Sequence, residues 1–196
     1  GIATALINNN LTGAALAHCL SISGASHVIT DGSCLDALAS IRVGLARPLS
    51  TWVIDMDAVL SEGQQHLDLK HPAIAPERPP RARRAGLKSK DVALYIFTSG
   101  TTGMPKAAKI THVRAQLYMR AFAGMANANA EDRLYNVLPL YHSTGGLCGV
   151  GAALLNGATL VLRRKFSATH FWNDVDTYRC TIFVYIGELC RYLLNQ

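Results

Sequence analysis

Charged residues are scarce in this chain of 196 residues: they make up 16% of it, whereas hydrophobic residues make up 49%. A free-standing domain usually carries about a quarter charged residues, and a disordered segment buries far less apolar surface. The composition therefore excludes a disordered tail and predicts a compact chain with a sizeable core. It also predicts apolar faces that a larger protein would cover. Because the chain also lacks an initial Met, we expect it to be a piece of a longer polypeptide.

The chain also lacks pairs of cysteines at the spacing typical of metal-binding or redox sites. The five cysteines form no C-x-x-C pair, and their number is odd. This pattern supports neither a disulfide framework nor a zinc site, and reduced thiols in a cytoplasmic protein are the simplest interpretation. The histidines are scattered along the chain, so we predict no structural metal.

No uninterrupted apolar run marks a targeting or membrane-spanning segment. Residues 1–30 have neither the basic start nor the cleavage site of a signal peptide. The stretch Leu134–Leu162 is long enough by count to cross a bilayer, but Pro139, the polar run Tyr141–Thr144 and several glycines interrupt it. We interpret it as a buried strand, a loop, a helix and a second strand.

Much of the net charge of +6 lies in one stretch that is also rich in proline. This mixture indicates an exposed linker, and attraction to phosphates or anionic lipid is the functional alternative. Aromatic residues are not interleaved with the basic ones, so a nucleic-acid partner is not supported. The basic residues are Arg78, Arg81, Arg83, Arg84, Lys88 and Lys90.

Short apolar runs alternate with helix-like stretches along most of the chain. The apolar runs are continuous, as strands of a parallel sheet covered on both faces require, and their alternation with helices implies βαβ units. The sequence therefore predicts an α/β fold of layered subdomains with mostly parallel sheets. We expect a first αβ segment over residues 1–55, an irregular basic linker over 56–90 and a second αβ segment over 91–196.

The predicted elements follow from these runs. The predicted strands are Ala3–Ile7, His27–Thr30, Thr51–Ile54, Ala93–Thr98, Ala107–Thr111, Leu134–Leu138, Thr159–Leu162 and Thr181–Tyr185. The predicted helices are Thr12–Ser23, Ser33–Gly44, Val113–Met125, Gly146–Leu155, His170–Tyr178 and Glu188–Leu194.

One loop has the composition of a polyphosphate-binding site. Its glycines permit positive φ and a close approach of the backbone to an anion, its amides and hydroxyls are donors, and its lysine supplies a point charge. It differs from the P-loop, and a simple hairpin connection is the alternative. We favour phosphate binding because nine consecutive residues of this kind end in Pro-Lys. The loop reads Thr98-Ser99-Gly100-Thr101-Thr102-Gly103-Met104-Pro105-Lys106.

With its preceding strand, this loop closely resembles the phosphate-binding signature of the adenylate-forming superfamily. That superfamily includes acyl-CoA synthetases, luciferases and nonribosomal peptide adenylation domains. The segment Leu138–Ser143 (LPLYHS) resembles a family segment whose aromatic and His residues lie between the acyl and adenylate sites. From the residues alone, His142 would more often be a hydrogen-bonded core histidine. The resemblance instead implies that His142 gates or orients substrate and that Tyr141 lines the substrate site.

Other segments narrow the resemblance to the fatty-acid-transport-protein and very-long-chain acyl-CoA synthetase group. They are Ala5–Leu11 with His18–Leu20, Lys165–Ala168 with Phe171–Trp172, and Tyr185–Gln196, while the likeness weakens between about residues 45 and 90. Gly187 and Glu188 are substrate-site candidates, although a helix start with an acidic first turn is an equal or better interpretation of them. The chain would then be an incomplete part of the large N-terminal domain.

The resemblance implies an enzyme that joins a long- or very-long-chain fatty acid to coenzyme A through an acyl adenylate, using ATP and Mg²⁺. It makes Lys106 and His142 the catalytic candidates and Thr102 the candidate Mg²⁺ contact. It makes the nucleotide-binding candidates Thr98, Ser99, Gly100, Thr101, Thr102, Gly103 and Lys106. The adenine, ribose and catalytic-lysine motifs of the family are not found in the chain, so we expect activity of the full-length protein and little from these residues alone.

Three alternatives remain open from the sequence. One is an adenylate-forming enzyme for another carboxylic acid, and the second is a membrane-associated fatty-acid transport protein. The third is a nucleotide-binding regulatory module. We expect small-molecule partners, no nucleic acid, and a cytoplasmic location with peripheral contact to the inner face of a membrane.

Overall fold

A computed structural model describes residues 1–70, 80–98 and 103–196. It divides the chain into two compact units, Gly1–Leu87 with Phe97–Lys109, and Lys88–Ile96 with Ile110–Gln196. The division passes through strands β5 (Val92–Thr98) and β6 (Lys106–Thr111), which form a sheet of order β1-β5-β6 with β1 (Thr4–Leu6).

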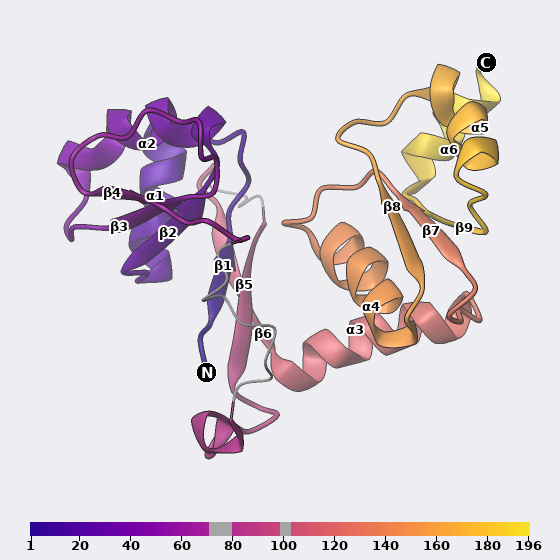
Figure 1. Ribbon diagram of the computed structural model, residues 1–196, viewed down its shortest axis with the longest axis horizontal. Helices are drawn as coiled ribbons and strands as arrows, with labels where there is room; N and C mark the ends of the chain where they lie inside the picture. The colour runs from indigo at the N-terminus through magenta and orange to yellow at the C-terminus, as the bar shows by residue number, and fades with distance from the viewer. Residues whose placement is uncertain (71–79, 99–102) are drawn as a thin grey trace. The chain divides into compact units, whose positions relative to one another are not determined.

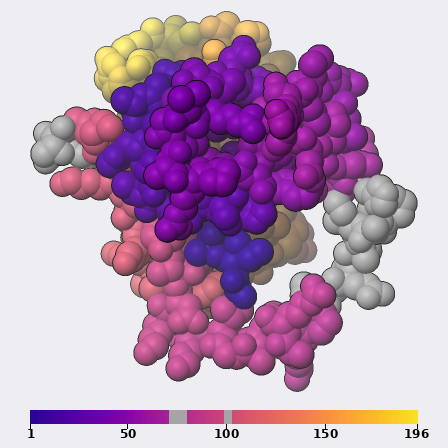
Figure 2. All heavy atoms as spheres, turned by 90° about the vertical axis from the view of Figure 1, so that its left-hand side faces the viewer, coloured from indigo at the N-terminus to yellow at the C-terminus, as the bar shows by residue number. Residues whose placement is uncertain are grey.

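The first unit contains a parallel sheet of order β2-β3-β4. Its strands are β2 (His27–Thr30), β3 (Ser50–Val53) and β4 (Gln64–His66). Helices α1 (Gly13–Ser23) and α2 (Leu35–Ile41) pack around a core of Leu16, Leu20 and Ile41. Short 3₁₀ turns cover Gly32–Cys34, Arg42–Gly44 and Arg81–Arg84. Strands β2, β3 and β4 and helices α1 and α2 are drawn in indigo to purple in Figure 1, and Figure 2 shows this unit as spheres in the same colours.

Strand β4 lies inside the segment for which the sequence predicted no regular structure, so it was missed. Its three residues, Gln64 to His66, are polar and form no apolar run. Backbone pairing with β3 holds them, and the Leu67 amide next to the strand donates to the Val53 carbonyl at 2.7 Å. This strand is therefore a product of tertiary pairing, which local propensity does not reveal.

The basic turn Arg81–Arg84 is exposed, whereas Arg78 lies outside the described residues.

The second unit contains another parallel sheet, of order β8-β7-β9. Its strands are β7 (Arg133–Asn136), β8 (Thr159–Leu162) and β9 (Ile182–Val184). Its helices are α3 (His112–Met125), α4 (Ala152–Asn156), α5 (Ala168–Thr177) and α6 (Gly187–Leu194). A π-helical segment, Thr144–Gly151, leads into α4. The two parallel sheets confirm the predicted α/β class.

The central strand β7 is covered on both faces. Tyr135 packs edge-on against Phe171 of α5, with ring centroids 5.5 Å apart. The next residue, Asn136, contacts the π-helical segment, and successive strand residues point to opposite faces. The Tyr135 hydroxyl donates to buried Asp174 at 2.8 Å, and Arg163 pairs with the same carboxylate at 2.9 Å. Burial, reinforced by the bond to Asp174, raises the pKa of Tyr135.

The uncharged stretch Leu134–Leu162 has the organisation predicted for it. It contains β7, a loop, the π-helical segment with α4, and β8. No helix in the described part of the chain combines the length and the apolar character needed to cross a bilayer.

Candidate nucleotide and substrate site

The described part of the predicted phosphate loop lies between β5 and β6. Thr98 ends β5 and is exposed, whereas Ser99, Gly100, Thr101 and Thr102 lie outside the described residues. Gly103 has φ of 91°, a left-handed value that glycine adopts at little cost. No atom lies within 4 Å of the position that a Cβ on Gly103 would take. The loop therefore needs glycine here for its backbone conformation rather than for lack of space.

Lys106 is the first residue of β6, and its side chain is exposed. The two ion pairs found among the described residues join Arg163 to Asp174 and Arg191 to Glu188, so neither engages Lys106. The backbone of Lys106 is held in a strand while its ammonium group faces solvent. A lysine placed in this way suits a phosphate oxygen, because its charge is accessible and its attachment point is ordered.

A second group of predicted residues gathers at one edge of the sheet β8-β7-β9. Tyr141 and His142 follow β7, and Gly187 and Glu188 follow β9. Strands β7 and β9 are parallel neighbours, with Asn136 opposite Val184. The residues that follow them therefore leave the sheet at its carboxyl edge, where ligands bind in open α/β sheets. Only the strand pairing revealed that these two pairs of residues, far apart in sequence, share an edge.

The loop after β7 presents His142 to solvent. The His142 amide donates to the Pro139 carbonyl at 3.1 Å, and the Gly146 amide donates to the His142 carbonyl at 2.8 Å. The rings of Tyr141 and His142 are tilted by 54° with centroids 4.7 Å apart, and Tyr141 is half-buried. His142 is therefore exposed in this chain and does not belong to its described core.

Asn136 holds this loop and was not among the predicted site residues. Its side chain is fully buried, donates to the Gly145 carbonyl at 3.0 Å and accepts from the Leu138 amide at 3.1 Å. The amide therefore connects the two ends of the segment that carries Tyr141 and His142. A polar residue inside the apolar run Leu134–Leu138 was the feature of the sequence that could have revealed it, because a buried amide needs partners.

The glycines of the π-helical segment allow it to lie directly against the end of β7. A Cβ on Gly145 would fall 2.7 Å from the Leu138 carbonyl oxygen, and a Cβ on Gly149 would fall 2.7 Å from Nδ2 of Asn136. Real Cβ atoms do not come that close to other heavy atoms. Alanine at either position would push the segment away from Asn136. Single π-turns inside helices are frequent at functional sites.

Glu188 lies in the first turn of α6 and pairs with Arg191 one turn later. The hydrogen bond with Arg191 lowers the pKa of the Glu188 carboxyl. Both side chains are largely exposed. These contacts agree with the alternative interpretation, an acidic residue at a helix start, and leave the backbone of Gly187 as the group best placed to line a site.

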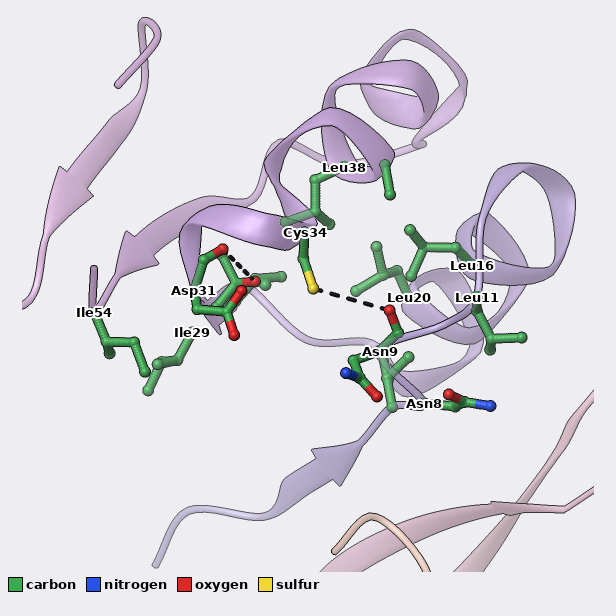
Figure 3. Close-up of a pocket in the computed structure, with 14 residues that line it drawn as sticks. Asn8, Asn9, Leu11, Leu16, Leu20, Ile29, Asp31, Cys34, Leu38 and Ile54 are labelled. Carbon is green, nitrogen blue, oxygen red and sulfur yellow. Dashed lines mark hydrogen bonds between the residues drawn. The ribbon is translucent and has the colours of Figure 1, made fainter. Parts of the chain in front are cut away.

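A cavity of about 310 Å³ lies in the first unit, at the carboxyl ends of β1 and β2 (Figure 3). Polar groups on its rim already have partners within the chain. Asp31 accepts from the Ser33 amide at 2.9 Å, Asn8 accepts from the Asn10 amide at 2.9 Å, and the Cys34 thiol faces the Asn9 carbonyl at 3.9 Å. None of the predicted site residues lines this cavity. We therefore assign it no part in the chemistry below.

Within residues 1–70, 80–98 and 103–196, no group of three His, Cys, Asp or Glu side chains is placed to hold a metal ion. Mg²⁺ in nucleotide sites is often held by only one or two protein groups together with phosphate oxygens and water. The candidate contact, Thr102, lies outside the described residues.

Solved structures share the architecture of this chain. The N-terminal domain of FACL13 from Mycobacterium tuberculosis matches 99% of this chain with a TM-score of 0.77 at 22% identity, over 46% of its own length. A putative long-chain-fatty-acid CoA ligase from Rhodopseudomonas palustris matches 97% with a TM-score of 0.74 at 19% identity, over 45% of its length. The chain has the fold of a part of the N-terminal domain of acyl-CoA ligases.

The sequence comparisons identify the family. The profile described as "AMP-binding enzyme" matches residues 1–196. This chain belongs to the AMP-binding enzyme family.

Curated relatives match the whole chain. Long-chain fatty acid transport protein 1 of Bos taurus is 44% identical and Long-chain fatty acid transport protein 6 of Mus musculus is 39% identical. The Medium/long-chain-fatty-acid–CoA ligase FadD6 of M. tuberculosis is 38% identical. All of this chain is covered in each case, but only 30%, 31% and 31% of these relatives respectively. The chain therefore spans about a third of the length of the relatives it matches.

Proposed function

We propose that the full-length protein is an ATP-dependent fatty acyl-CoA synthetase and that this chain supplies its phosphate-binding loop and part of its acyl site. The observation that carries the proposal is the placement of Lys106. It follows a Ser/Thr/Gly loop, its backbone is held at the start of β6, and its ammonium group is exposed. The names of the relatives, which include fatty-acid transport proteins and a fatty-acid–CoA ligase, support the substrate class.

The reaction has two steps. A fatty-acid carboxylate oxygen attacks the α-phosphorus of ATP, the bond between the α-phosphorus and its bridging oxygen breaks, and pyrophosphate leaves with that oxygen. The thiol of coenzyme A then attacks the acyl carbonyl carbon, AMP leaves and the thiol proton passes to solvent. The carboxylate is already ionised near neutral pH, so the first step needs no general base.

Catalysis of the first step consists mainly of positioning and charge neutralisation. Lys106 binds an oxygen of the β- or γ-phosphate and stabilises the departing pyrophosphate. The amides and hydroxyls of the loop, from Thr98 to Gly103, donate to the same phosphates. Thr102 would be the contact of this chain with Mg²⁺, which would supply further neutralisation of the phosphate charge.

The carboxyl edge of the sheet β8-β7-β9 holds the acyl side of the reaction in this proposal. His142 orients the carboxylate or gates its entry, Tyr141 lines the pocket beside it, and the backbone of Gly187 borders the site after β9. His142 is exposed and Tyr141 is half-buried. This difference supports an orienting or gating role for His142 and a pocket-lining role for Tyr141.

Thioester formation by the full-length protein tests this function. With ATP, Mg²⁺ and coenzyme A, we expect thioester from a fatty-acid panel, with yield that rises from short to long chains because each buried methylene contributes about 0.8 kcal/mol. Aryl and amino acids in the same panel distinguish an adenylate-forming enzyme for another carboxylic acid. Intact ATP binding without thioester from any acid would instead support a nucleotide-binding regulatory module.

Fatty-acid transport at a membrane is a second candidate, favoured by the names of several relatives. We propose that the basic turn Arg81–Arg84 makes peripheral contact with the anionic inner face of a membrane, because its three arginines are exposed and no acidic side chain interrupts them. Basic residues near such a surface contribute about 1 kcal/mol each.

Replacing Arg81, Arg83 and Arg84 together by alanine should therefore weaken binding to phosphatidylserine vesicles by at least about tenfold at low salt. Co-sedimentation measures this, with neutral phosphatidylcholine vesicles as the reference lipid. The matched control replaces Arg114, Arg120 and Arg164, three exposed arginines elsewhere in the chain, by alanine. Equal loss in the control would assign the attraction to net charge and rule out a specific role for the basic turn.

A further inference from the structure

A histidine on the first helix contacts the end of the phosphate loop. Nε2 of His18, on α1, lies 3.0 Å from the carbonyl oxygen of Pro105, although the two residues are 87 positions apart in the sequence. Both residues are half-buried and belong to the first unit. A carbonyl oxygen can only accept, so Nε2 carries the hydrogen and donates it.

Helix α1 is a rigid support for this imidazole. The neighbouring Cys19 is fully buried, and Leu16 and Leu20 belong to the core of the first unit. The helix ends at Gly24 in the left-handed conformation, with φ of 63°, which is a common way to terminate a helix. His18 therefore projects from an element whose position is set by core packing, and functional groups held in this way are the more precisely placed ones.

Pro105 has little else with which to anchor its backbone. Proline lacks an amide hydrogen, so its carbonyl is the only backbone group through which it can form a conventional hydrogen bond. The next residue, Lys106, begins β6. Gly103, two residues before Pro105, adopts a positive φ that the loop needs in order to turn. The bond from His18 thus fixes the peptide through which the turning loop enters the strand that carries Lys106.

We propose that His18 is a positioning residue for the phosphate loop. It holds the Pro105–Lys106 peptide so that the ammonium of Lys106 meets the phosphates of ATP. The inference rests on the proposed function, because that function gives Lys106 its role. The contact between His18 and Pro105 is independent of it. Neutral imidazole with its hydrogen on Nε2 and imidazolium both donate to the carbonyl.

Substitutions that separate the hydrogen bond from the shape of the side chain test the proposal in the full-length protein. His18→Leu removes the donor and introduces an apolar side chain, whereas His18→Gln places an amide donor at similar reach. A misplacement of about 1 Å in a positioned group can lower the rate by about 10²-fold. We expect His18→Leu to lower kcat/KM for ATP by about tenfold or more in fatty-acid-dependent ATP–pyrophosphate exchange, with the KM for fatty acid unchanged. His18→Gln should recover most of the loss.

Hydrogen–deuterium exchange supplies a second measurement that needs no turnover. The backbone amides of residues 103–111 should exchange faster in His18→Leu and return toward the wild-type rate in His18→Gln. His27→Leu is the matched control, because His27 accepts a hydrogen bond from Trp52 within the same unit. This control should change neither the exchange of residues 103–111 nor the KM for ATP.

The outcomes separate the two proposals. Wild-type protein that shows no ATP–pyrophosphate exchange with any acid would overturn the proposed function, and the amide exchange would then decide whether His18 orders the loop. Equal effects of His18→Leu and His18→Gln on both measurements would overturn the role of the hydrogen bond. Unchanged amide exchange and unchanged kinetics in His18→Leu would do the same.

Discussion

Lys106→Ala should lower fatty-acid-dependent ATP–pyrophosphate exchange of the full-length protein by about 10²-fold to 10³-fold, the loss typical when one donor that stabilises developing charge is removed. The ammonium group of Lys106 is exposed at the start of β6, where its backbone is ordered and its charge is accessible. Its removal takes away a charge that the departing pyrophosphate needs. Because the side chain is exposed, the thermal unfolding midpoint should stay within the range of neutral surface substitutions.

The same strand offers a matched control for this variant. Lys109 is also exposed and lies three residues further along β6. Lys109→Ala removes the same charge from the same strand, so the exchange rate should change little. If both variants lose activity equally, the net charge of the strand matters and Lys106 has no specific contact with phosphate. If neither variant loses activity, another residue holds the phosphates.

Gly145→Ala should lower the free energy of unfolding by about 2–3 kcal/mol, at the upper end of the cost of adding a methyl group to a packed interior. The added Cβ would fall 2.7 Å from the Leu138 carbonyl oxygen, and backbone atoms cannot move aside as a flexible side chain could. The clash also separates the Gly145 carbonyl from the buried amide of Asn136. Denaturant unfolding followed by the fluorescence of the aromatic residues measures the change.

A second glycine in the same unit serves as the reference. Gly124 lies in α3, and no atom lies within 4 Å of the position that its Cβ would take. Gly124→Ala should be neutral or should stabilise the protein by up to about 1 kcal/mol, because alanine favours a helix over glycine. Equal stability of the two variants would show that the π-helical segment does not press against the loop after β7. A kinetic comparison should also show a loss in Gly145→Ala alone, since the same loop carries Tyr141 and His142.

Much of the fold could be predicted from periodicity. The continuous apolar runs of β2, β3, β7, β8 and β9 were expected, and pairing confirms the parallel arrangement. The helix expected over Gly146–Leu155 exists, but its first part is π-helical. This departure has a tertiary cause, because glycines in the segment allow it to lie directly against Asn136 of β7, the loop after β7 and Met119 of α3. Strand β4 was missed since its polar residues are held only by pairing with β3.

The amino-acid sequence by itself determined the chemistry that this protein can offer. The Ser/Thr/Gly loop ending in Pro105 and Lys106, the LPLYHS segment and the alternating apolar runs are local patterns, so neighbouring residues are enough to recognise them. Only the tertiary structure decided which distant residues act together. The pairing of β7 with β9 brought Tyr141 and His142 to the same sheet edge as Gly187. Packing of α1 placed His18 against Pro105, and burial of Asn136 joined the ends of the His142 loop. These contacts depend on strand order and core packing, which involve residues far apart in the chain and leave little trace in any short stretch of sequence.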